Sequence, residues 1–192
     1  MEAFLVSSGI VAIAEIGDKT QLLALLLAAK FRKPVPIILG IFVATIANHA
    51  GAAAIGAWVA GLMGEQVMRW VLVASFVAMG AWVLVPDKVD DAAAETAPRF
   101  GVFGATVIAF FLLEMGDKTQ IATIALSARY GQWWLVALGT TLGMMAANVP
   151  AVLIGQAAAK ALPMAVVRYG TAMAFLGLAV VLAFTGLPTL GG

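Results

Sequence analysis

The stretch AEIGDKTQLLALLLAAKF, Ala14 to Phe31, returns 99 residues later as LEMGDKTQIATIALSARY, Leu113 to Tyr130. Both copies carry the same polar run, E-x-G-D-K-T-Q, inside otherwise apolar sequence. The offset continues through helical sequence further on, where it pairs Gly40 with Gly139. The paired motif residues are Glu15 and Glu114, Gly17 and Gly116, Asp18 and Asp117, Lys19 and Lys118, Thr20 and Thr119, and Gln21 and Gln120. A fixed offset of this length indicates that the chain contains two copies of one structural unit.

The composition excludes a soluble protein. Of the 192 residues, 63% are hydrophobic and 11% are charged, with a mean hydropathy of +1.04, whereas a soluble domain carries about 25% charged residues because its surface faces water. Cysteine is absent and His49 is the single histidine, which excludes disulfides and thiolate sites and argues against zinc. The net charge of +1 provides no basic surface for nucleic acid. The partner that this composition predicts is the lipid bilayer.

Six apolar runs are long enough to cross a bilayer as helices, because a span needs about 20 residues and must satisfy its own backbone groups. We expect them at about 4–29, 34–62, 67–85, 100–128, 133–158 and 166–187, with Pro150 inside the fifth. A polar stretch with more acids than bases separates the third run from the fourth. The prediction is an all-α integral membrane protein, divided into a three-helix repeat at 1–86, an acidic linker at 87–99 and a second three-helix repeat at 100–192.

The number of spans per half determines how the repeats are related. Three helices per half make the second copy enter the membrane from the opposite side, which gives an inverted repeat with its substrate site near the midplane. The N-terminus has no basic region, and Glu15 interrupts the first apolar run, so we expect a retained helix and no signal peptide. With both termini outside, seven basic residues lie in inside loops against two in outside loops. This distribution predicts external termini and a cytoplasmic linker.

The repeated motif lies at the depth of the expected site. Glu15 is about 11 residues into the first predicted helix, which at 1.5 Å per residue is about 16 Å, or half of a hydrocarbon core of about 30 Å. Each motif places two acids and a lysine there, and each charged group costs about 2.5–3.5 kcal/mol at that depth. Ion pairing that only locks the helices together is the alternative, but buried ion pairs are often no better than apolar packing.

The spacing indicates what the acids do. Glu and Asp at i and i+3 share a helix face, so the candidate metal ligands are Glu15, Asp18, Glu114 and Asp117. Gly17 and Gly116 favour local unwinding that frees carbonyl oxygens. Four carboxylates and two lysines leave a charge of −2, which a divalent cation neutralises. Residues with secondary roles in metal binding or proton coupling are Lys19, Lys118, Thr20, Thr119, Gln21, Gln120, Asn48 and Asn148.

The donor set is dominated by oxygen, which suits Mn²⁺, Ca²⁺ or Mg²⁺ better than Cu, Zn or Ni. His49 follows Asn48 and pairs with Asn148 through the repeat; direct ligation and ordinary packing are both open for it. We expect Lys19 and Lys118 to pair with Glu15 and Glu114 at i+4 when no metal is bound. Clustered carboxylates repel one another, so their affinity for protons rises when no metal is bound. Metal and protons therefore compete for the same oxygens.

At these residues the chain resembles the GDT1/TMEM165 family, which includes bacterial manganese exporters. The resemblance rests on two copies of E-x-G-D-(K/R)-(T/S), one in each half, separated by an acidic loop, and it covers the whole chain. It implies a secondary transporter, not an enzyme, that exports Mn²⁺ across the plasma membrane in exchange for protons, with the motif acids as its cation site. Ca²⁺ is the alternative substrate. No resident cofactor is implied.

Three other functions remain to be compared with this one. A divalent cation channel could use the same acids, although two helices form a closed site more readily than a pore. An intramembrane aspartyl protease would use Asp18 and Asp117, but the neighbouring lysines would hold both acids ionised. A membrane scaffold that transports nothing leaves the duplicated charges unexplained. Both a monomer and a homodimer are compatible with the sequence.

Overall fold

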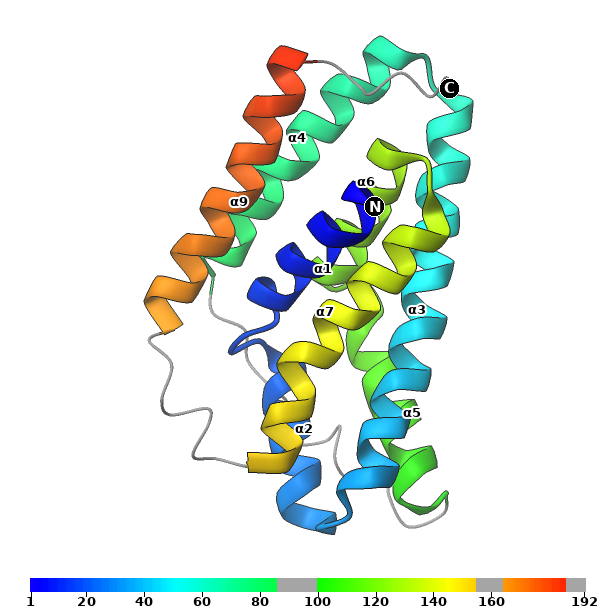
Figure 1. Ribbon diagram of the computed structural model, residues 1–192, viewed down its shortest axis with the longest axis vertical. Helices are drawn as coiled ribbons and strands as arrows, with labels where there is room; N and C mark the ends of the chain where they lie inside the picture. Colours follow the sequence, from blue (N-terminus) through cyan, green and yellow to red (C-terminus); the bar gives the residue numbers. More distant parts are fainter. Residues whose placement is uncertain (86–99, 155–163, 186–192) are drawn as a thin grey trace.

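The computed structural model describes residues 1–85, 100–154 and 164–185, and every regular element in these ranges is an α-helix. The expected linker at 87–99 lies outside the described residues. The helices (Figure 1) are α1 (Glu2–Ala14), α2 (Lys19–Phe31), α3 (Pro34–Leu62), α4 (Glu65–Val83), α5 (Gly101–Glu114), α6 (Lys118–Tyr130), α7 (Trp133–Ile154) and α9 (Met164–Thr185). The all-α prediction is confirmed for this part of the chain.

The distribution of side chains is that of a membrane protein. Large apolar residues cover the surface, including Phe184 at 85% exposure and all five tryptophans. The interior contains charged groups, with Glu15 and Glu114 both at 0% exposure. Among the described helices, α3, α4 and α7 are long and apolar enough to cross a membrane, and α1, α5 and most of α9 are shorter apolar helices. A surface this apolar is stable against lipid and not against water.

Two of the expected helices are interrupted. We predicted continuous helices over about 4–29 and 100–128, but the first divides into α1 and α2 and the second into α5 and α6. The interruptions fall on Gly17 and Gly116, whose φ angles of 77° and 76° are left-handed. That conformation is favourable for glycine and ends a right-handed helix. The local unwinding expected at both glycines is therefore present, and we call residues 15–18 and 114–117 the two elbows.

The other boundaries agree closely with expectation. The helix expected at 34–62 is α3, with the same bounds, and Pro34 occupies its first turn, where its missing N–H costs nothing. The helix expected at 67–85 begins two residues earlier, at Glu65, as α4. Pro150 lies inside α7, as predicted. The long helices α3 and α7 pack against the interrupted helices that contain the elbows.

The two halves pack as a pseudo-symmetric pair. In Figure 1 the run from α1 to α2 descends while the run from α5 to α6 ascends, so the interrupted helices are antiparallel. Helix α1 packs along α7, and its repeat equivalent α5 packs along α3. In the same way α2 contacts α7 and α6 contacts α3, while α3 packs on α7 and α4 on α9. Each interrupted helix therefore lies against the long helix of the opposite half.

Glycines of the repeat permit this close packing. A Cβ on Gly40 of α3 would lie 2.7 Å from Thr106 Cβ of α5, and a Cβ on Gly139 of α7 would lie 2.5 Å from the Phe4 carbonyl oxygen of α1. Neither position has room for a side chain. Because Gly40 and Gly139 are equivalent in the repeat, the same kind of close contact is built twice, once on the long helix of each half.

Candidate metal site

Each elbow is a tight turn closed by a backbone hydrogen bond between its glutamate and its aspartate. The Asp18 amide donates to the Glu15 carbonyl over 3.1 Å, and the Asp117 amide donates to the Glu114 carbonyl over 3.1 Å. In the second elbow Met115 has φ −63° and ψ 118° and is followed by Gly116 at φ 76°. These are the angles of a type II turn, which requires a positive φ at its third position and therefore favours glycine. The E-x-G-D spacing thus encodes a turn, so the two acids of each motif do not share a continuous helix face as we expected.

The glutamines of the motif close the elbows. Gln21 Oε1 accepts the Gly17 amide at 2.8 Å, and Gln120 Oε1 accepts the Gly116 amide at 2.7 Å. The amide groups of the same side chains extend to the opposite half. Gln21 Nε2 donates to the Ala147 carbonyl of α7 at 3.0 Å, and Gln120 Nε2 donates to Asn48 Oδ1 of α3. The glutamines therefore satisfy backbone groups freed by the turn and attach each elbow to the other half.

Three of the four predicted acids converge on one point. Carboxylate oxygens of Glu15, Glu114 and Asp117 all lie within 4.8 Å of one another. Glu15 and Glu114 are fully buried and Asp117 is 3% exposed. Because the group takes one acid from the first elbow and two from the second, neither half could form it alone. Oxygens at these separations are close enough to coordinate a single ion.

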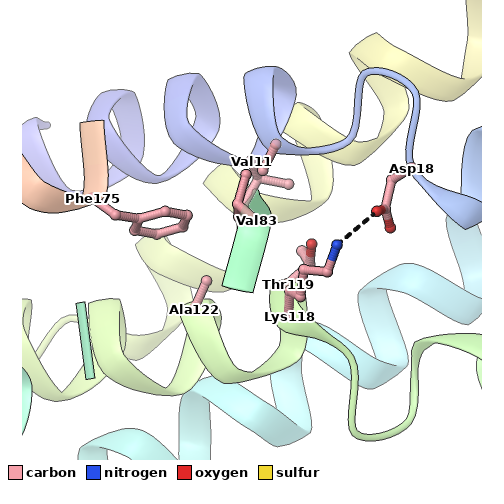
Figure 2. Close-up of a pocket in the computed structure, with 8 residues that line it drawn as sticks. Val11, Asp18, Val83, Lys118, Thr119, Ala122 and Phe175 are labelled. Atoms are coloured by element: carbon pink, nitrogen blue, oxygen red, sulfur yellow. Dashed lines mark hydrogen bonds and ion pairs between the residues drawn. The ribbon is translucent and has the colours of Figure 1, made fainter. Parts of the chain in front are cut away.

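Asp18 lies to the side of this group. Its Oδ1 is 3.4 Å from Lys118 Nζ, and the two residues line a small cavity with Val11, Val83 and Phe175. Figure 2 shows the Lys118 ammonium directed from α6 toward the Asp18 carboxylate across the space between the elbows. The four predicted ligands are thus neighbours, but the structure gathers three of them and pairs the fourth with a lysine.

The lysines join opposite motifs. We expected each lysine to pair with the glutamate of its own motif, but Lys19 Nζ is 2.8 Å from Asp117 Oδ1, and Lys118 contacts Asp18. The physical reason is the elbow, which interrupts the helix between Glu15 and Lys19 and removes the i, i+4 geometry. Two reciprocal ion pairs result, each crossing between the halves.

The two glutamates differ in the hydrogen bonds that their carboxylates accept from the remaining polar side chains. Glu15 accepts hydrogen bonds from the hydroxyls of Thr20 and Thr119, one from each motif. Neither carboxylate oxygen of Glu114 accepts a hydrogen bond from the described residues. His49 Nε2 of α3 is 3.8 Å from Glu114 Oε2. Asn48, the preceding residue, donates to the Phe111 carbonyl and accepts from Gln120.

Asn148 occupies the position equivalent to His49 on α7. It is fully buried, and its Nδ2 donates to the Met144 carbonyl at 3.0 Å. The sequence predicts a secondary role in metal binding for Asn148, and its Oδ1 has no hydrogen-bond partner among the described residues. The position of His49 beside Glu114 was not predicted, because the repeat gives the equivalence of α3 and α7 but not which residue of α5 each one faces.

The charge of the site suits a divalent cation. Glu15, Asp18, Glu114 and Asp117 carry −4 when all are ionised, and two lysines reduce this to −2. A buried site with this residual charge is costly when empty, because buried ions are stable only when compensated. Protons or a doubly charged ion can supply the compensation. The oxygen-rich donor set favours a hard ion such as Mn²⁺, Ca²⁺ or Mg²⁺.

Comparison with known proteins agrees with this chemistry. The sequence model of a protein family described as "Divalent cation/proton antiporter GDT1" matches residues 3–91 and 102–189 of the chain. A protein of Vibrio cholerae serotype O1 named "Putative manganese exporter" is 51% identical over 186 residues, which cover 96% of this chain and 92% of that protein. No solved structure matches the chain.

Proposed function

Because the chain belongs to the GDT1 family of divalent cation/proton antiporters, we propose that it exports Mn²⁺ across the plasma membrane in exchange for protons. Membership makes the protein a membrane transporter and not an enzyme, with divalent cations and protons as the substrates of its family. The choice of Mn²⁺ is supported by the Vibrio cholerae protein named "Putative manganese exporter", whose similarity to this chain extends over nearly its whole length.

The observation that carries the proposal is the buried group of Glu15, Glu114 and Asp117, formed between the halves of the molecule. We assign these three acids as ligands of the transported ion. Asp18 completes the four-carboxylate site when Lys118 releases it. A site built from both halves changes its exposure when one half moves against the other, which is what alternating access requires.

The proposed membrane architecture has six spans. The runs α1 to α2 and α5 to α6 each form one interrupted span, and α3, α4, α7 and α9 form the others. The first three spans, within 1–86, and the last three, within 100–192, make two inverted repeats. Support comes from the antiparallel course of the interrupted helices (Figure 1). The distribution of basic residues supports external termini and a cytoplasmic linker at 87–99.

The exchange itself follows from competition for the same oxygens. With no metal bound, Lys19 and Lys118 compensate Asp117 and Asp18 through the pairs that cross between the halves, and protons compensate the glutamates. An entering divalent ion supplies two positive charges and displaces protons. When protons or a divalent ion neutralise the charge, the site can change the side of the membrane to which it is exposed. An empty and fully ionised site is too costly to make this change. Metal and protons therefore move in opposite directions.

The glycines and neutral polar residues have supporting roles in this proposal. Gly17 and Gly116 allow the turns that end α1 and α5, and Gln21 and Gln120 hold these turns closed. The hydroxyls of Thr20 and Thr119 orient the Glu15 carboxylate, as their hydrogen bonds to it indicate.

The test is metal flux in proteoliposomes that contain the purified protein. Vesicles loaded with Mn²⁺ should release it faster when the external pH is lowered, with matching proton entry reported by a trapped dye. Glu114→Gln should abolish both fluxes, while Glu65→Gln, at the exposed start of α4, should leave them unchanged. Mn²⁺ release that ignores the pH gradient would indicate a channel, and release of Ca²⁺ in strong preference to Mn²⁺ would indicate a Ca²⁺/H⁺ antiporter.

A further inference from the structure

His49 is a buried imidazole without the hydrogen bonds that such a group normally makes. Its side chain is fully buried, and neither Nδ1 nor Nε2 has a hydrogen-bond partner among the described residues. A neutral imidazole carries one donor and one acceptor, and buried polar groups in folded proteins are nearly always satisfied. An exception of this kind requires an explanation, for example an ion that the polar group binds.

The position of His49 points to such an ion. Nε2 lies 3.8 Å from Glu114 Oε2, and that carboxylate also accepts no hydrogen bond from the described residues. A separation of 3.8 Å is too long for a hydrogen bond. Two donor atoms that each lie about 2.1–2.3 Å from one metal ion are about 3–4 Å apart. The unsatisfied imidazole and the unsatisfied carboxylate are therefore spaced like two ligands of the same ion.

The repeat makes this nitrogen donor exceptional. All four motif acids occur in repeat-related pairs, but the equivalent of His49 is Asn148. Asn148 offers a carbonyl oxygen that, like the ring nitrogens of His49, has no hydrogen-bond partner in the described part of the chain. At this repeat position the two halves therefore differ in the buried atom that has no hydrogen-bond partner, which is a ring nitrogen on α3 and an amide oxygen on α7.

We propose that Nε2 of His49 coordinates the transported ion beside Glu114 and gives the site its preference for Mn²⁺ over Ca²⁺ and Mg²⁺. This inference rests on the proposed function. Imidazole binds transition metal ions well, whereas Ca²⁺ and Mg²⁺ take oxygen donors almost exclusively. One nitrogen among carboxylates therefore discriminates between ions of equal charge, which the acids alone do poorly.

A pulsed electron paramagnetic resonance experiment on bound Mn²⁺ tests the assignment directly. Because His49 is the only histidine of the chain, protein purified without a polyhistidine tag has a single possible imidazole ligand. We expect the spectrum of wild-type protein with one equivalent of Mn²⁺ to show the modulation of a directly coordinated imidazole ¹⁴N. The modulation should be absent in His49→Asn, which makes the two halves equivalent at this position.

A transport measurement on the same proteins provides the second readout. In His49→Asn the concentration of Ca²⁺ that halves Mn²⁺ flux should fall about tenfold, as expected for loss of one metal ligand, while Ca²⁺ flux persists. Asn148→His should shift the same ratio in the opposite direction. Bound Mn²⁺ without imidazole modulation in the wild type would overturn the inference about His49 and leave the proposed function standing. Failure of the wild type to bind or transport Mn²⁺ would overturn both.

Discussion

At the level of single residues, two lysines compensate two of the buried acids. Lys19 contacts Asp117 at 2.8 Å and Lys118 contacts Asp18 at 3.4 Å, so each ammonium compensates an acid of the other motif. All four groups are largely buried. Removing one partner of such a pair leaves an uncompensated charge away from water, which is costlier than removing both.

This arrangement makes a prediction about stability. Lys19→Met should lower the free energy of unfolding by about 3 kcal/mol, because Asp117 is left without its cation. The double variant with Asp117→Asn should recover much of that loss, because no unpaired charge remains. The measurement is the thermal unfolding midpoint in detergent, treated as a double-mutant cycle.

The matched control combines Lys19→Met with Asp18→Asn, the aspartate of the same motif. Its coupling to Lys19 should be much the smaller of the two. Equal coupling of Lys19 to Asp18 and to Asp117 would show that the lysine has no preference for the acid of the other motif. That result would contradict the ion pairs that cross between the halves.

Part of the candidate site could be predicted from residue types and spacing. The repeat singled out the three acids that the structure brings together, and Asp18 lies beside them in a pair with Lys118. The lysine partners were predicted incorrectly, because Glu15 and Lys19 were placed on one continuous helix. Which acid each lysine meets depends on the packing of one half on the other, and no local pattern contains that information.

At the scale of secondary structure, the elbows determine where the carboxylates stand. The turn at Glu114 to Asp117 depends on the left-handed φ of Gly116, which is 76°. A Cβ at Gly116 would meet nothing within 4 Å. Any penalty for a side chain there is therefore conformational and not steric, which allows the turn to be tested without disturbing its neighbours.

Substitutions at Gly116 should follow backbone preference and not size. Gly116→Ala should cost about 1–2 kcal/mol of the turn's stability, because alanine disfavours left-handed φ. Gly116→Asn should retain more transport than Gly116→Ala despite its larger side chain, since asparagine tolerates this region, and Gly116→Val should retain the least. The readout is Mn²⁺ flux per inserted protein. Alanine performing better than asparagine would mean that the turn is dispensable.

The close contacts between helices give a second prediction at this scale. Gly40→Ala and Gly139→Ala should each destabilise the protein by about 1–3 kcal/mol, because a Cβ would overlap Thr106 in one case and the Phe4 carbonyl in the other. Gly51→Ala is the matched control, since Gly51 lies on the same helix as Gly40 and a Cβ there would meet nothing within 4 Å. Thermal unfolding in detergent measures all three. Similar midpoints for Gly40→Ala and Gly51→Ala would contradict the close packing of α3 on α5.

The sequence predicted elements well where hydrophobicity and proline mark them. The bounds of α3 and the position of Pro150 inside α7 agree with expectation. Glycine in an apolar run is a weaker signal, because it breaks some helices and packs against neighbours in others. Gly17 and Gly40 illustrate the two outcomes: the first has left-handed φ and ends a helix, and the second lies within α3 against α5.

At the scale of the whole molecule, two repeats of three spans each require an inverted topology. Reporter fusions at the two termini should be active outside the cytoplasm, and a fusion at Asp91, within the linker, should be active inside. The physical basis is the excess of basic residues in the loops on the linker side. Comparing a pair of reporters with opposite compartment requirements at each position makes the measurement. A cytoplasmic C-terminus would imply a different number of spans.

The relation between the halves could be predicted only in outline. An odd number of helices per repeat implies inversion, and the antiparallel course of the interrupted helices agrees with it (Figure 1). The sequence could not show that Asp18 would stand apart from Glu15, Glu114 and Asp117. That asymmetry depends on the relative position of the halves, which the repeat leaves free.

We propose that the two motifs form one metal site, and this arrangement sets the stoichiometry of Mn²⁺ binding to the purified protein. Titration calorimetry should give one Mn²⁺ per chain for the wild type. Glu15→Gln in the first motif and Glu114→Gln in the second should each abolish that binding, because both glutamates belong to the same buried group. Two ions per chain in the wild type, with one retained in each variant, would show that the motifs bind metal separately and would contradict the shared site.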